Sequence, residues 1–159
     1  MAKTKPEEAY RVREPAPKLS PQEAMVYIMV ITSAADRDMG DEELARIGAI
    51  VRTLPLFAGF DQAGTLRVAQ ACQKALAAEG GLPDVLEAIR DALSPRLRET
   101  AYALAVDVAA IDLDIREEED RILDIVKARF SIDPLAAAAI GRTVHLAPGC
   151  PEIDTARLQ

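Results

Sequence analysis

Aromatic residues are scarce in this chain of 159 residues: they make up 4% of it, and tryptophan is absent. Strands draw heavily on aromatic and β-branched side chains, whereas the many alanines of this chain favour helix. A β-sandwich or a β-barrel is therefore excluded. Half of the residues are hydrophobic, so a chain of this length has enough apolar material to bury a core as one domain.

Thiols are also few in this chain, and long apolar runs are absent. Its two cysteines, Cys72 and Cys150, are too far apart for a disulfide framework or a zinc-binding motif, so we expect a cytoplasmic protein. No apolar run is long enough to span a bilayer, and the N-terminus lacks the apolar core of a signal peptide. Direct insertion into a membrane is therefore not expected.

Basic residues are outnumbered: 19 Lys and Arg stand against 26 Asp and Glu, and the net charge is −7. A nucleic-acid-binding domain needs a basic surface, so no contact with nucleic acid is expected. An acidic surface instead attracts cations or a basic partner.

Motifs of the common enzyme classes are missing as well. The sequence has no glycine-rich phosphate loop, no HExxH and no Ser–His–Asp arrangement. We therefore predict that the protein is not an enzyme. A metal-dependent hydrolase that works with carboxylates alone is the less favoured alternative.

What the chain has is a series of helical segments. Residues 1–19 hold three prolines and mixed charges and are predicted to be a flexible arm; residues 20–146 form a helical domain, and residues 147–159 an irregular tail. Capping residues followed by proline mark several helix starts, as in Ser20-Pro21. The predicted helices are 21–35, 41–53, 62–78, 83–93, 95–111, 117–129 and 134–145. An α+β fold is the alternative class.

Two predictions concern side chains inside these helices. In the third segment we expect a buried stripe of Leu66, Ala69, Cys72 and Leu76, with an inert Cys72 thiol. Asp107 interrupts the apolar run 102–111, so its carboxylate must reach a partner or the rim of the fold.

Two parts of the chain match when the sequence is shifted by 76 residues. Each part consists of an apolar helix, an acidic turn and a second helix, and the aligned positions share their chemistry: Val30 and Val106, Asp36 and Asp112, Asp38 and Asp114, Glu43 and Glu119, Ile47 and Leu123. The pattern predicts an all-α bundle of about seven helices with two pseudo-symmetric helix–acidic turn–helix units.

The carboxylates of these turns have two interpretations. They can cap the helix that follows, which is worth about 1 kcal/mol for each cap. They can also bind a divalent cation, since Ca²⁺ and Mg²⁺ prefer oxygen ligands. The spacing is not that of an EF-hand, because Asp41 and Ile47 stand where that loop needs Gly and Glu. The candidate metal ligands are Asp36, Asp38 and Glu43 in the first unit, and Asp112, Asp114 and Glu119 in the second.

The segments Ala35-Asp36-Arg37-Asp38-Met39 with Glu43, and Ile111-Asp112-Leu113-Asp114-Ile115 with Glu119, resemble the turn motif of the TerB tellurite-resistance family. A related unit occurs in the N-terminal domain of the co-chaperone DjlA. The resemblance covers about residues 20–145. It departs from the family at Arg37 and Leu113, which replace a glycine suited to positive φ.

The resemblance implies a compact seven-helix domain without enzymatic activity, which takes part in resistance to tellurite and other stresses. It also implies a protein partner, with calcium-binding and membrane-associated proteins as the family's associates. We therefore expect an interaction module whose acidic turns contact a basic partner or a cation such as Ca²⁺ or Mg²⁺. A weak divalent-cation sensor is the alternative.

Overall fold

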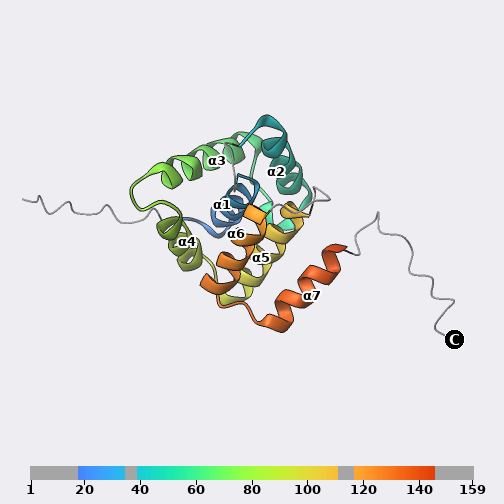
Figure 1. Cartoon of the computed structure of the whole chain (residues 1–159). Helices are drawn as coiled ribbons and strands as arrows, with labels where there is room; N and C mark the ends of the chain where they lie inside the picture. The colour runs from blue at the N-terminus through green and yellow to red at the C-terminus, as the bar shows by residue number, and fades with distance from the viewer. Residues whose placement is uncertain (1–17, 35–38, 111–116, 146–159) are drawn as a thin grey trace, which may run out of the picture.

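The computed structural model describes residues 18–34, 39–110 and 117–145, and all of the secondary structure in these ranges is helical (Figure 1). The predicted all-α class is therefore confirmed. The elements are α1 (Pro21–Ser33), α2 (Asp41–Thr53), the short 3₁₀ helix η1 (Pro55–Phe57), α3 (Gln62–Ala77), α4 (Gly81–Ala92), α5 (Pro95–Ala109), α6 (Glu117–Arg129) and α7 (Pro134–His145).

The helix starts follow the local chemistry of their caps. At α1, the Ser20 hydroxyl accepts a hydrogen bond from the backbone N–H of Glu23 (3.1 Å), and the Glu23 carboxylate accepts one from the backbone N–H of Ser20 (2.8 Å). At α3, Asp61 Oδ1 accepts from the backbone N–H of Gly64 (2.6 Å). Each bond satisfies a backbone donor that has no partner inside the helix.

Helix α4 begins at Gly81, two residues before the predicted start at Pro83. Gly81 has φ +49°, which reverses the chain between α3 and α4, and only glycine adopts such a φ without strain. Pro83 then lies in the first turn, where a missing N–H costs no intrahelical hydrogen bond.

Helix α1 is the centre of the fold. All residues from Ala24 to Thr32 are buried, and α1 packs against α2, α3, α4, α5 and α6. Figure 1 shows these helices arranged around it, with α7 at the edge of the molecule, where it packs against α5. A helix that is apolar on every side is expected in this central place.

Two predictions about individual side chains can be judged. Leu66 was expected in the core, and this was wrong: its side chain is 43% exposed. Ala69 and Cys72 are buried as predicted, and Leu76 is half-buried. The other buried residues of α3 are Gly64, Thr65 and Val68, so the stripe passes on the other side of Leu66. Asp107 is exposed, so its carboxylate lies at the rim and remains in water.

No helix within the described ranges is both long enough and apolar enough to cross a membrane.

Candidate acidic site

The first turn of α2 consists of three carboxylates, Asp41, Glu42 and Glu43. Asp41 and Glu42 are exposed, whereas Glu43 is half-buried. Gly40 occupies the N-cap position and has no side chain with which to cap the helix. Three negative charges at the positive end of the helix dipole are favourable, although they also repel one another.

The Glu43 carboxylate turns back toward the start of its own helix. A Cβ atom placed on Gly40 would lie 2.7 Å from Glu43 Oε2, which is closer than real Cβ atoms approach an oxygen. The absence of a side chain at Gly40 therefore leaves room for this carboxylate. It lies on the side from which the chain enters α2.

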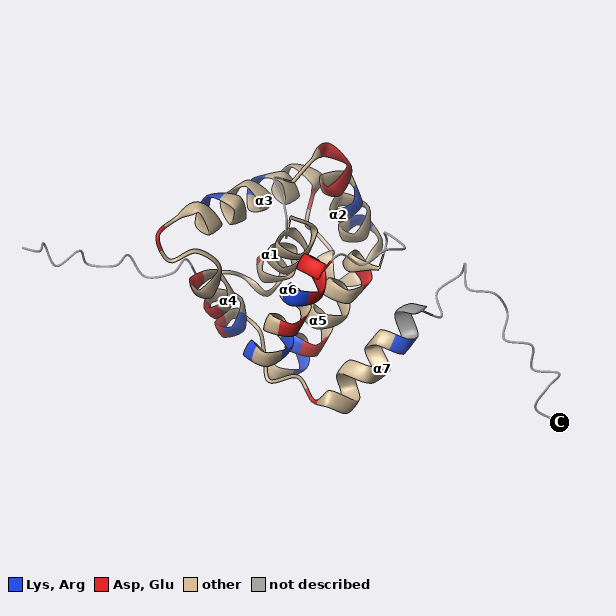
Figure 2. Cartoon of the chain, viewed as in Figure 1, with Lys and Arg blue, Asp and Glu red and all other residues tan. Residues whose placement is uncertain are grey.

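The first turn of α6 repeats this arrangement with four carboxylates, Glu117, Glu118, Glu119 and Asp120. Glu119 occupies the same helical position as Glu43 and is also half-buried, while the other three are exposed. Figure 2 shows acidic residues at the starts of both α2 and α6. The last turns of these helices are basic, with Arg52 in α2 and Lys127 and Arg129 in α6.

Two of the six predicted metal ligands, Glu43 and Glu119, lie in the described helices. The other four, Asp36, Asp38, Asp112 and Asp114, belong to 35–38 and 111–116 and lie outside the described residues. Within the part of the chain that the structure does describe, no three His, Cys, Asp or Glu side chains are grouped to hold a metal ion. The metal site therefore stays a prediction.

The thiol of Cys72 is not a reactive nucleophile. Its side chain is fully buried, and burial raises the pKa of the Cys72 thiol to about 12. Burial also raises the pKa of the neighbouring Tyr27 hydroxyl. Both groups are protonated at neutral pH, which agrees with the inert thiol expected from the sequence.

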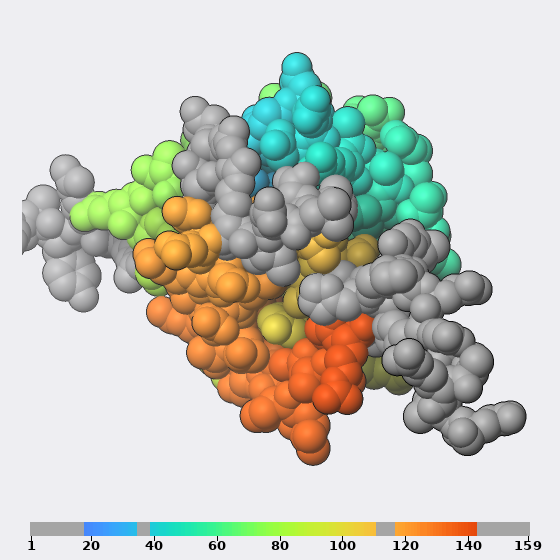
Figure 3. All heavy atoms as spheres, turned by 45° about the vertical axis from the view of Figure 1, so that its right-hand side comes forward, coloured from blue at the N-terminus to red at the C-terminus, as the bar shows by residue number. Residues whose placement is uncertain are grey.

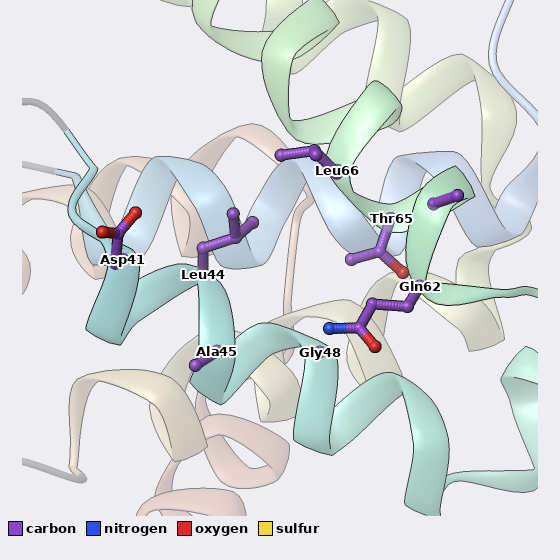
Figure 4. Close-up of a pocket in the computed structure, with 8 residues that line it drawn as sticks. Asp41, Leu44, Ala45, Gly48, Gln62, Thr65 and Leu66 are labelled. Carbon is purple, nitrogen blue, oxygen red and sulfur yellow. The ribbon is translucent and has the colours of Figure 1, made fainter.

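A groove lies between α2 and α3, and it was not predicted from the sequence. It has a volume of about 270 Å³. The residues that line it are Asp41, Leu44, Ala45 and Gly48 from α2, and Gln62, Ala63, Thr65 and Leu66 from α3; all but Ala63 are labelled in Figure 4. The one sequence signal that pointed to it is Gly48, a glycine in the middle of a helix.

The family model described as "Tellurite resistance protein TerB" matches residues 22–145. Neither a curated protein nor a solved structure matches the chain. The matched span runs from the first turn of α1 to the last residue of α7, so it covers the helical bundle and most of the chain.

Proposed function

The chain belongs to the TerB family of tellurite-resistance proteins, and we propose that it is a non-enzymatic module of the stress response that binds through the first turns of α2 and α6. Its ligand in this proposal is a basic surface on a partner protein, of the membrane-associated kind that the family resemblance implies. A cytoplasmic setting suits two cysteines that fit no disulfide framework.

The observation that supports this proposal is an excess of carboxylates. A capping carboxylate accepts a hydrogen bond from one of the four free backbone N–H groups at a helix start and contributes about 1 kcal/mol. The first turns of α2 and α6 hold three and four acidic residues, five of which are exposed. Capping does not account for the additional charges, and adjacent carboxylates repel one another. A cationic ligand would relieve that repulsion at both helix starts.

A divalent cation is the second candidate ligand, and the position of Glu43 favours it. The carboxylate turns back over Gly40 instead of extending into solvent along the helix. This places an oxygen ligand at the entry to α2. In the sequence, Glu43 follows Asp36 by seven residues and Asp38 by five. The carboxylate-only ligand set suits Ca²⁺ or Mg²⁺, and binding would be weak because the site is open to water.

Calorimetric titration of the full chain separates these ligands. The probes are Ca²⁺, Mg²⁺, Zn²⁺ and a lysine-rich peptide, and the site variant combines Glu43→Gln with Glu119→Gln. The control combines Glu87→Gln with Glu99→Gln, which removes the same charge from exposed sites on α4 and α5.

The proposal predicts heat from at least one probe with the wild type and the control, and a smaller heat with the site variant, which lacks one carboxylate in each first turn. Heat with the peptide alone identifies a basic partner, and heat with a metal ion identifies the cation. Flat traces with all four probes at millimolar concentration, or equal heats for the site variant and the control, contradict it.

A further inference from the structure

The groove between α2 and α3 is lined mainly by small and apolar residues, together with the amide of Gln62 and, at the start of α2, the carboxylate of Asp41. Ala45 and Ala63 are exposed along it, and Leu66 leaves 43% of its surface in water beside it. Asp41 lies at the N-terminal end of α2, while Arg52 occupies the last turn of the same helix. Figure 3 shows α2, in cyan to turquoise, at the surface of the molecule.

Gly48 lines the groove and is itself buried, yet the packing around it leaves room for a Cβ atom. Glycine destabilises the interior of a helix relative to alanine, so it is usually found where a side chain would collide with something. A Cβ atom on Gly48 would meet only Nη1 of Arg52, at 3.8 Å, which is an ordinary van der Waals contact with a flexible side chain. The fold therefore has room for a Cβ atom at Gly48, and a side chain there would make the groove shallower.

The residues along this side of α2 are arranged symmetrically about its middle. Asp41, Ala45, Gly48 and Arg52 are separated by four, three and four residues, so they lie in one row on the helix. Reversing the direction of the helix about a point between positions 46 and 47 exchanges Asp41 with Arg52 and Ala45 with Gly48. The row is therefore complementary to an antiparallel copy of itself.

We propose that the groove is a homodimer interface, in which α2 of a second copy lies antiparallel across α2 and against Leu66 of α3. At the centre, Ala45 faces Gly48 of the partner subunit, and these small residues allow the two helices to approach closely. At each end, Asp41 pairs with Arg52 of the partner subunit. A two-fold contact of this kind closes on itself and buries the same surface on both copies.

This dimer rests on other observations than the function proposed above, although Asp41 belongs both to the acidic first turn of α2 and to the groove. The acidic-site variant, Glu43→Gln with Glu119→Gln, changes no residue that lines the groove. Its failure to bind a cation or peptide would therefore leave the dimer untouched, and a monomeric protein would leave the acidic site untouched.

Charge exchange tests the antiparallel arrangement, with sedimentation velocity of the full chain at micromolar to millimolar concentrations as the measurement. Asp41→Arg alone and Arg52→Asp alone place like charges at both ends of the interface. Each is expected to weaken the dimer about tenfold, the effect of two exposed ion pairs. A mixture of the two single variants restores opposite charges at both ends, and so does the double variant. Both are expected to recover the wild-type association.

Filling the groove is the second test. Gly48→Leu is expected to abolish the dimer while the helical circular dichroism of the monomer is retained. Gly141→Leu is the matched control, because it lies in α7 and a Cβ atom there meets nothing within 4 Å. A wild type that is monomeric at every concentration, or a dimer indifferent to the charge exchanges and to Gly48→Leu, would overturn the proposal.

Discussion

At the scale of single residues, burial decides the chemistry of Cys72. Its Sγ lies 3.9 Å from the carbonyl oxygen of Tyr27, inside the contact between α1 and α3. Removal of water disfavours the thiolate and raises the pKa from its ordinary value of 9.0 to about 12. The thiol therefore behaves as a small apolar side chain.

The raised pKa predicts how stability depends on pH. Below pH 9 the thiol is protonated in both states and has no effect. Between pH 9 and about 12 the unfolded chain loses this proton while the folded chain keeps it, so the free energy of unfolding falls. The slope is up to about 1.4 kcal/mol per pH unit.

Urea denaturation of the wild type and of Cys72→Ala, from pH 8 to pH 11, measures this contribution. As the pH rises, the free energy of unfolding of the wild type should fall relative to that of Cys72→Ala. A difference that stays constant would show that the thiol ionises normally in the folded state.

Leu66 and Leu86 provide a matched pair of leucines. Leu66 is 43% exposed, and Leu86 is 2% exposed. Leu86→Ala should lower the free energy of unfolding by about 2–5 kcal/mol, because it leaves a cavity in the core, whereas Leu66→Ala should lower it by less than about 1 kcal/mol. The measurement is urea denaturation at a low micromolar protein concentration, at which the proposed dimer is dissociated. Equal losses of stability in the two variants would show that Leu66 is a core residue.

At the scale of helices, the sequence predicts starts well because caps are local. Ser20, Asp61 and Ser94 each accept a hydrogen bond from the helix that they precede, and the helices begin directly after them. The bounds predicted for α2 are those of the structure. A cap needs only a few neighbouring residues, so its signal is complete in the sequence.

Features that depend on the placement of two helices were not predictable in this way. The apolar residues of α3 are compatible with more than one buried stripe, and its contacts with α1, α2 and α4 select the stripe that excludes Leu66. The groove beside Leu66 is formed by residues of both α2 and α3, so it depends on how these two helices pack against each other. Of the acidic site, the repeat predicted the matching positions of Glu43 and Glu119, while the four other predicted ligands lie outside the described residues.

The cap of α3 is a test at this scale. Asp61→Ala removes the acceptor of the 2.6 Å hydrogen bond to Gly64 and should cost about 1 kcal/mol of stability. Asp61→Asn keeps an acceptor oxygen at the same position and should cost a smaller amount. Thermal unfolding of both variants gives the comparison, and equal losses would assign the effect to the charge of Asp61 instead of to the cap.

At the scale of the whole molecule, the duplicated sequence is organised around one pair of helices. Helices α1 and α5 pack against each other, α2 follows α1 and contacts it, and α6 follows α5 and contacts it. Each acidic first turn thus begins the second helix of its unit. Equivalent helices with equivalent carboxylates, Glu43 and Glu119, are the basis of the proposal that both units bind the same kind of ligand.

An NMR titration of the ¹⁵N-labelled full chain with Ca²⁺, and separately with a lysine-rich peptide, tests this claim most directly. The account predicts that the backbone amides at the starts of α2 and α6 shift together, with the same ligand and over the same concentration range. The chemical shifts of the backbone amides in α3 and α4 should not change. No shifts with either ligand at millimolar concentration, or shifts confined to other helices, would contradict it.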